Sequence, residues 1–180
     1  MRRSALFLFV FLLAGAVAGA FAQAVPDATA HRLKITAGVM GSYFQPDEGK
    51  NNLAGVGTFV DFDFSRWVQV EAEGRWLRWN EYYGEHQDNY LIGLRVPVKQ
   101  FGKFGLYGKT LVGYGKMTFP FNYGYGTFTD LAFGGTLDYR LSHRFTVRAA
   151  DFEYQYWPVW INNQSLAPYG FSAGIGYRIF

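Results

Sequence analysis

The chain has 180 residues, with 17 Lys and Arg against 14 Asp and Glu, no cysteine, 20% aromatic residues and a mean hydropathy near zero. The lack of cysteine excludes a disulfide framework and thiolate metal sites. Two of the basic residues fall in a predicted leader, which leaves 15 basic against 14 acidic residues, so the basic isoelectric point does not indicate a nucleic-acid partner.

The first 22 residues have the three parts of a secretory signal peptide. Two arginines follow the first methionine, an apolar run comes next, and Ala20 and Ala22 fit the small-x-small pattern of a cleavage site. A single spanning anchor is the alternative, but the apolar run is short for a membrane-crossing helix. We therefore predict a signal peptide over residues 1–22 and one exported domain over residues 23–180.

Apolar and polar residues alternate with a period of two through the rest of the chain, which is the pattern of half-buried β-strands. The alternation is clearest in the third segment, where Val70 and Ala72 alternate with Glu71 and Glu73. Eight strands are predicted, at residues 33–44, 53–64, 68–78, 89–99, 104–118, 128–141, 145–156 and 169–180.

The seventh segment changes phase along its length. Phe145 has one parity, whereas Phe152 and Tyr154 have the other. One extra residue at Ala149–Ala150 would bring all three aromatic rings to the same face. We therefore predict a β-bulge at these two alanines.

The connections between the segments alternate between short and long. Three short turns are predicted at 65–67, 100–103 and 142–144, and four long loops at 45–52, 79–88, 119–127 and 157–168. An eight-stranded barrel with both chain ends on one side has these counts, and no exported segment reaches the ~18 consecutive apolar residues of a spanning helix. The prediction is an all-β, transmembrane, antiparallel up-and-down β-barrel of about eight strands. A secreted soluble barrel of the lipocalin type is the alternative fold.

The exported chain resembles the family of eight-stranded outer-membrane β-barrels that includes the OmpA transmembrane domain and OmpX. The resemblance rests on the alternating strands, on Tyr-Gly-Lys at 107–109 with Gly-Tyr-Gly at 113–115, and on the ending Gly-Ile-Gly-Tyr-Arg-Ile-Phe. It implies that Tyr177 and Phe180 form the terminal signal read by the barrel-assembly machinery, with the aromatic spacing shifted by one from the usual pattern. It also implies a bacterial outer-membrane location, membrane lipid as a partner and a monomeric state.

The predicted register turns most charged side chains into the lumen. Near-balance of acids and bases is what a buried, self-neutralising network requires. The inward set contains eight bases and seven acids, and Lys34 and Lys99 are two of the bases. Such a set can be a gate or a pore lining, or it can simply fill a narrow barrel with polar side chains. Its other members are Asp61, Asp63, Glu71, Glu73, Arg75, Arg95, Lys109, Asp138, Arg140, Arg148, Asp151, Glu153 and Arg178.

The long loops carry aromatic residues beside small polar ones, a mixture that suits recognition surfaces. The same rings could instead lie in the lipid interface as an aromatic girdle. The predicted surface contacts are Tyr82, Tyr83, Tyr123, Tyr125, Trp157 and Trp160.

Catalytic and metal-binding patterns are not found. His31, His86 and His143 do not lie at the spacing of a nucleophilic system with a Ser or a carboxylate, and Ser142–His143 falls in a predicted tight turn. No enzyme activity, cofactor, metal or nucleic-acid partner is therefore expected. The predicted function is a structural or adhesin-like surface barrel with an unidentified surface ligand. The alternatives are a channel of low conductance and an outer-leaflet lipid-modifying enzyme.

Overall fold

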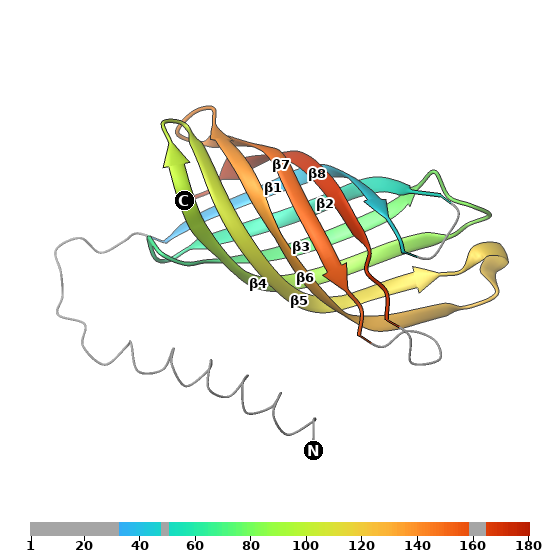
Figure 1. Cartoon of the computed structure of the whole chain (residues 1–180). Coiled ribbons are helices and arrows are strands. Elements are labelled where there is room, and N and C mark those ends of the chain that lie inside the picture. Colours follow the sequence, from blue (N-terminus) through green and yellow to red (C-terminus); the bar gives the residue numbers. More distant parts are fainter. Residues whose placement is uncertain (1–32, 48–50, 159–164) are drawn as a thin grey trace, which may run out of the picture. The chain divides into compact units, whose positions relative to one another are not determined.

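The computed structural model describes residues 33–47, 51–158 and 165–180, and these form a closed antiparallel β-barrel (Figure 1). Its strands are β1 (Lys34–Gln45), β2 (Leu53–Asp63), β3 (Gln69–Trp79), β4 (His86–Phe101), β5 (Phe104–Thr118), β6 (Tyr125–Arg140), β7 (Phe145–Tyr156) and β8 (Tyr169–Arg178). A short 3-10 helix, η2 (Pro120–Asn122), lies between β5 and β6. Within the described ranges, no helix has the length and apolarity to cross a membrane. The predicted signal peptide lies outside these ranges.

Each strand pairs with its sequence neighbours, and β1 also pairs with β8, so the sheet has no free edge. The predicted eight-stranded up-and-down barrel is confirmed. β5 and β7 have the predicted bounds, whereas β4 and β6 each begin three residues earlier than predicted. These extra residues pair with the end of β5, for example Gln87 with Met117 and Tyr125 with Thr118. The β4–β5–β6 region therefore projects further at the long-loop end than the alternation alone indicated.

The predicted bulge in β7 is confirmed. Ala150 pairs with Leu137 of β6, and the next pair joins Arg148 to Asp138, so Ala149 is the extra residue. The pairing with β8 shifts at the same place. Because of this shift, Arg148 and Asp151 both lie in the lumen. They are three residues apart, and in a regular strand such residues would point to opposite faces.

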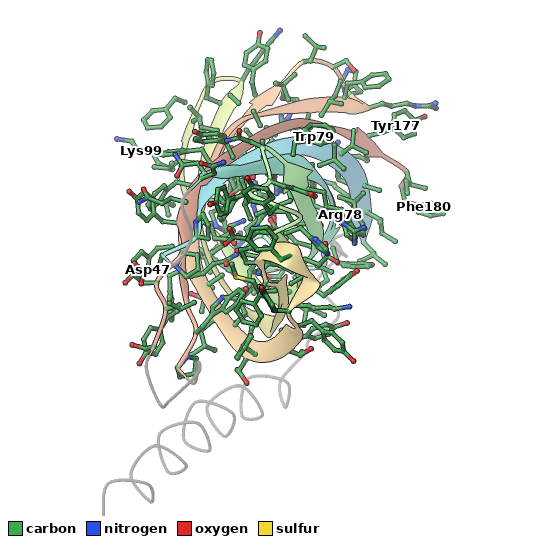
Figure 2. All side chains as sticks on the ribbon, turned by 90° about the vertical axis from the view of Figure 1, so that its right-hand side faces the viewer. Asp47, Arg78, Trp79, Lys99, Tyr177 and Phe180 are labelled. Carbon is green, nitrogen blue, oxygen red and sulfur yellow. The ribbon has the colours of Figure 1, made fainter. Side chains whose placement is uncertain are left out.

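A second irregularity, in β4, shows that the prediction for Lys99 was wrong. The register shifts between Pro97 and Lys99, so the side chain of Lys99 lies outside the barrel, near the ring of Phe101 (Figure 2). Pro97 has no backbone N–H, and a proline within a sheet is usually found at such irregular positions. The simple alternation therefore fails after this proline.

The outer wall is apolar and carries aromatic rings at two levels. Phe104 contacts Tyr139 near the short turns, and Tyr90 contacts Tyr114 toward the long loops. Phe104 and Tyr114 are ten residues apart on β5. With a rise of about 3.3 Å per residue and a strand tilt of about 40°, their levels differ by roughly 25 Å, the height of the apolar band of an outer-membrane barrel.

Large side chains fill the lumen where glycines on other strands leave room. Trp157 lies against Gly115, where an added Cβ would come within 2.3 Å of the indole ring. Phe44 lies in the same way against Gly170. The interior is therefore filled by side chains, as expected for eight strands.

Candidate functional site

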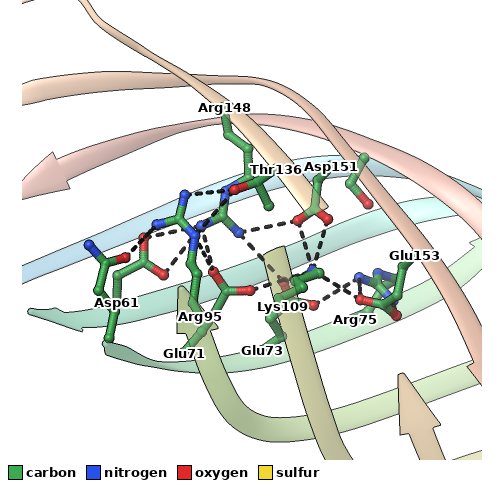
Figure 3. A network of polar contacts seen from close by, with 12 residues as sticks. Asp61, Glu71, Glu73, Arg75, Arg95, Lys109, Thr136, Arg148, Asp151 and Glu153 are labelled. Atoms are coloured by element: carbon green, nitrogen blue, oxygen red, sulfur yellow. Dashed lines mark hydrogen bonds and ion pairs between the residues drawn. The ribbon is translucent and has the colours of Figure 1, made fainter. Parts of the chain in front are cut away.

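The middle of the lumen holds ten charged side chains that are almost inaccessible to solvent. They come from the inward-facing positions of β2 to β7, where alternate residues share a face. The network, shown in large part in Figure 3, consists of Asp61, Glu71, Glu73, Arg75, Arg95, Lys109, Asp138, Arg148, Asp151 and Glu153. All ten belong to the inward set that the alternation predicts, and we refer to them as the charge network.

Arg148 reaches across the lumen and joins carboxylates from three strands. Its guanidinium donates to Glu71 at 2.7 Å, to Asp61 at 3.1 Å and to Asp151 at 3.2 Å. The guanidinium also lies 3.7 Å from the ring centre of Phe59. A planar, always charged fork suits such a site, because several carboxylates can bind it at once.

Arg95 makes the second junction, closer to the short turns. It donates to Asp61 at 3.1 Å, to Thr136 at 2.7 Å and to Asp138. It also lies 3.5 Å from Glu71 on the neighbouring strand β3, and it stacks over Tyr107. Glu73, two residues further along β3, contacts Lys109, Arg75 and Arg148.

Lys109 occupies a cage of four carboxylates. Its ammonium lies 2.7 Å from Glu73, 2.8 Å from Asp151, 3.0 Å from Glu153 and 3.4 Å from Glu71. Oxygen atoms of three of these residues lie within 4.8 Å of one another, a spacing that could hold a metal ion. In this structure the lysine ammonium supplies the positive charge at that place.

Arg75 connects the charge network to a layer of amides that sequence analysis missed. Arg75 donates to Glu153 at 2.8 Å, and Gln155 donates to the same carboxylate at 2.7 Å. Asn89 then donates to Asp130 at 2.6 Å and to Gln155 at 3.3 Å. These residues share the inward parity of their strands, so the alternation contained the signal that would have found them.

The charge network has six carboxylates and four basic groups, not the near-balance predicted from the sequence. The difference arises at the short-turn end, where Asp63, Arg178 and Lys34 are only half-buried and Arg140 is exposed. These charges at the short-turn end remain accessible to water, so the buried part of the lumen has an excess of acidic groups. Between them and the nearest residues of the charge network lies a cavity of about 50 Å³.

An apolar cluster closes the long-loop end of the lumen. Met117, Trp157 and Leu166 are buried there, and Phe119 and Phe128 pack against them. The indole of Trp157 stacks on Phe128, with ring centres 5.7 Å apart. We refer to the three buried residues as the apolar seal. A solute would have to displace both the apolar seal and the charge network to cross the barrel.

The burial of Trp157 contradicts its predicted place on the loop surface. Strand pairing continues beyond β7 as a bridge between Trp157 and Leu166, so the inward parity of Gln155 extends to Trp157. Among the other predicted loop contacts, Tyr83, Tyr123 and Tyr125 are exposed, and Tyr82 is half-buried. Trp160 lies outside the described residues.

The remaining predicted positions lie at the short-turn end. Tyr177 and Phe180 point away from the barrel on its outer side, and their role in assembly stays a prediction (Figure 2). Ser142 accepts hydrogen bonds from the backbone N–H groups of Arg144 and Phe145, so its hydroxyl stabilises a turn.

Comparisons with known proteins agree with this architecture. The model of the outer membrane protein beta-barrel domain family matches residues 9–178. No curated protein matches the chain.

Several solved structures have the same fold. Ail, the attachment invasion locus protein of Yersinia pestis, solved in complex with the heparin analogue sucrose octasulfate, is 22% identical, with a TM-score of 0.50 over 82% of this chain and 97% of that one. Neisserial surface protein A is 8% identical, with a TM-score of 0.60 over 81% and 96%. OprG from Pseudomonas aeruginosa is 14% identical, with a TM-score of 0.52 over 85% and 99%. At these identities the similarity concerns the fold.

Proposed function

Because the chain belongs to the outer membrane protein beta-barrel domain family, we propose that it is a monomeric surface barrel whose loops bind a ligand and whose lumen is a closed plug. The location is the bacterial outer membrane. In barrels of this membrane, the short turns face the periplasm and the long loops face outward. The loop end that carries Tyr83 and Tyr123 is therefore the surface offered to the environment.

The observation that carries this proposal is the double closure of the lumen. Removing one partner from a buried ion pair typically costs about 3–5 kcal/mol, because a charge remains uncompensated. A path through the charge network would separate several such pairs, and the apolar seal would still have to open. These costs favour a rigid scaffold over a permanent pore.

Surface binding is also supported by the neighbours in fold. Ail was solved with a heparin analogue, and another neighbour is named a surface protein. An eight-stranded barrel with a filled lumen has few other places for recognition than its loops. We extend a surface-binding role to this chain on these grounds.

Export and assembly form part of the same proposal. A signal peptide over residues 1–22 would direct the chain across the inner membrane, and Tyr177 with Phe180 would then be read by the assembly machinery. Mass spectrometry of the protein from outer membranes should give a chain that begins at Gln23. A protein that keeps residues 1–22 would contradict the cleavage.

The test of surface binding exchanges the loops and keeps the barrel. Residues 80–84 and 120–124 are replaced by Gly-Ser segments of the same length in one variant, and the short turn at 141–144 is replaced in the matched control. Cells that display the wild type or the control should attach to host-cell or matrix surfaces, and the loop variant should not. Equal attachment by all three, with heat-modifiable migration showing folded barrels, would contradict the proposal.

A low-conductance channel is the second candidate, and the polar lumen favours it. Rare and small openings would require the ion pairs to exchange partners. A lipid-modifying enzyme has no supporting constellation among the described residues.

A further inference from the structure

Two of the outward loops meet in a cluster of aromatic rings. The rings of Tyr83 and Phe121 are stacked, with their centres 4.4 Å apart and their planes at 21°. Tyr82 packs edge-on against Tyr83, and Tyr123 packs edge-on against Phe121. Tyr83, Phe121 and Tyr123 are nevertheless exposed, Tyr123 to 87%. We call Tyr82, Tyr83, Phe121 and Tyr123 the aromatic platform.

The backbone holds the aromatic platform in one arrangement. Asn80, Tyr83 and Phe121 have φ values of 63°, 50° and 60°, a left-handed conformation that bulky residues rarely adopt. The N–H of Phe121 donates to the carbonyl of Tyr83 at 2.8 Å, which ties the two loops together. Asn80 donates to the carbonyl of Asn52 at 2.8 Å and anchors the first loop to a third. Strained conformations of this kind concentrate where a ligand is clamped.

The aromatic platform lies above the lipid interface. On β5, Tyr114 belongs to the outer level of rings, and Thr118, four residues further on, pairs with Tyr125. Four residues of a strand tilted by about 40° rise roughly 10 Å. Phe121 and Tyr123 belong to the loop that joins Thr118 to Tyr125. Their rings therefore lie beyond the interfacial girdle, so contact with lipid does not account for their exposure.

The two loop segments that carry the aromatic platform are nearly uncharged. Residues 80–84 and 120–125 contain one charged side chain, that of Glu81. Nearby, the ammonium of Lys116 lies 4.9 Å from the ring centre of Tyr125, and Arg78 is paired with Asp88 at 2.7 Å. Within these two described segments, aromatic faces, phenol hydroxyls and amides are the main groups that a ligand would meet.

From this chemistry we infer that the aromatic platform binds a neutral saccharide. The C–H faces of a pyranose ring pack on aromatic rings, and its hydroxyl groups pair with amide and phenol groups. A sulfated or phosphorylated sugar would require a cluster of bases to neutralise it. This inference rests on the proposed surface-binding function and names its ligand class.

The test uses the full exported chain in lipid nanodiscs, which avoids detergents with sugar headgroups. Calorimetric titration with chitotriose, cellotriose and maltotriose should give saturable binding by at least one of them. The affinity should fall at least tenfold in Tyr83→Ala and in Phe121→Ala. It should stay within twofold in Tyr154→Ala, an exposed ring on the outer wall of β7. Raising the salt concentration should change the affinity little.

Two results would overturn the inference. One is no binding by any neutral trisaccharide to a folded barrel, and the other is stronger, salt-sensitive binding by sucrose octasulfate. Cell attachment separates this failure from failure of the proposed function. If attachment requires the replaced loops but the trisaccharides do not inhibit it, surface binding is supported and the saccharide is ruled out as the ligand. If the loop variant attaches as well as the wild type, surface binding by the loops is itself contradicted.

Discussion

The charge network and the apolar seal close the same lumen by different physical means. In the charge network, each group is stabilised only while its partners remain, as for Arg148 among Asp61, Glu71 and Asp151. In the apolar seal, the buried side chains of Met117 and Leu166 need only matching volume. The charge network should therefore be intolerant of a lost base, and the apolar seal should be intolerant of lost side-chain volume.

The largest effect should come from deletion of Ala149, the extra residue of the bulge. Without it, the residues on one side of the deletion would exchange faces, so either Arg148 or Asp151 and Glu153 would point into lipid. An Arg at the middle of the membrane costs roughly 2–4 kcal/mol, and the charge network would lose its central base as well. We expect no folded, heat-modifiable barrel on gels. Ala149→Ser keeps the residue count and should fold, and a folded deletion variant would refute the register argument.

The next largest effect is expected for Arg148→Met. The methionine fills similar space but leaves the carboxylates around Arg148 without their shared base, which should cost about 3–5 kcal/mol. Urea unfolding in phospholipid vesicles, followed by tryptophan fluorescence, measures this loss. Arg144→Met, on the exposed turn before β7, is the control and should change the free energy of unfolding by less than about 0.5 kcal/mol.

Removing volume from the apolar seal should have a smaller effect. Met117→Ala should cost about 2–3 kcal/mol through lost burial and the cavity that remains. The loss should be the same at low and high salt, because no charge is involved. A salt-dependent loss would show that the two regions are not independent. Val112→Ala, on the lipid-facing side of the same strand, is the matched substitution.

The smallest effect is expected for Glu73→Gln. The charge network has two more carboxylates than bases, and Glu73 lies close to Glu71 and Asp151. Neutralising it keeps the shape and relieves repulsion while weakening its contacts with Lys109 and Arg75. We expect the free energy of unfolding to change by less than about 1 kcal/mol, far less than for Arg148→Met. Equal losses for the two variants would contradict an acidic network.

Alternation alone predicted the barrel, the bulge and the ten inward charges, because a lipid-facing wall imposes a strict period of two. It failed at Lys99, where Pro97 breaks the register, and at Trp157, where pairing continues into the loop. The excess of acids could not be predicted, because it depends on which rim side chains reach water. The aromatic platform needs two loops that are distant in sequence to meet, which no local pattern of Tyr83 or Phe121 encodes.

Single-channel recording of the wild-type protein in planar bilayers tests the closed plug most directly. With both the charge network and the apolar seal in place, we predict a silent bilayer interrupted at most by rare, small steps. The recording should be made on protein whose folding has been verified by heat-modifiable migration, so that silence reflects a folded barrel. Stable, large, porin-like openings would contradict the account, because they would require a continuous aqueous path through side chains that the structure shows in contact.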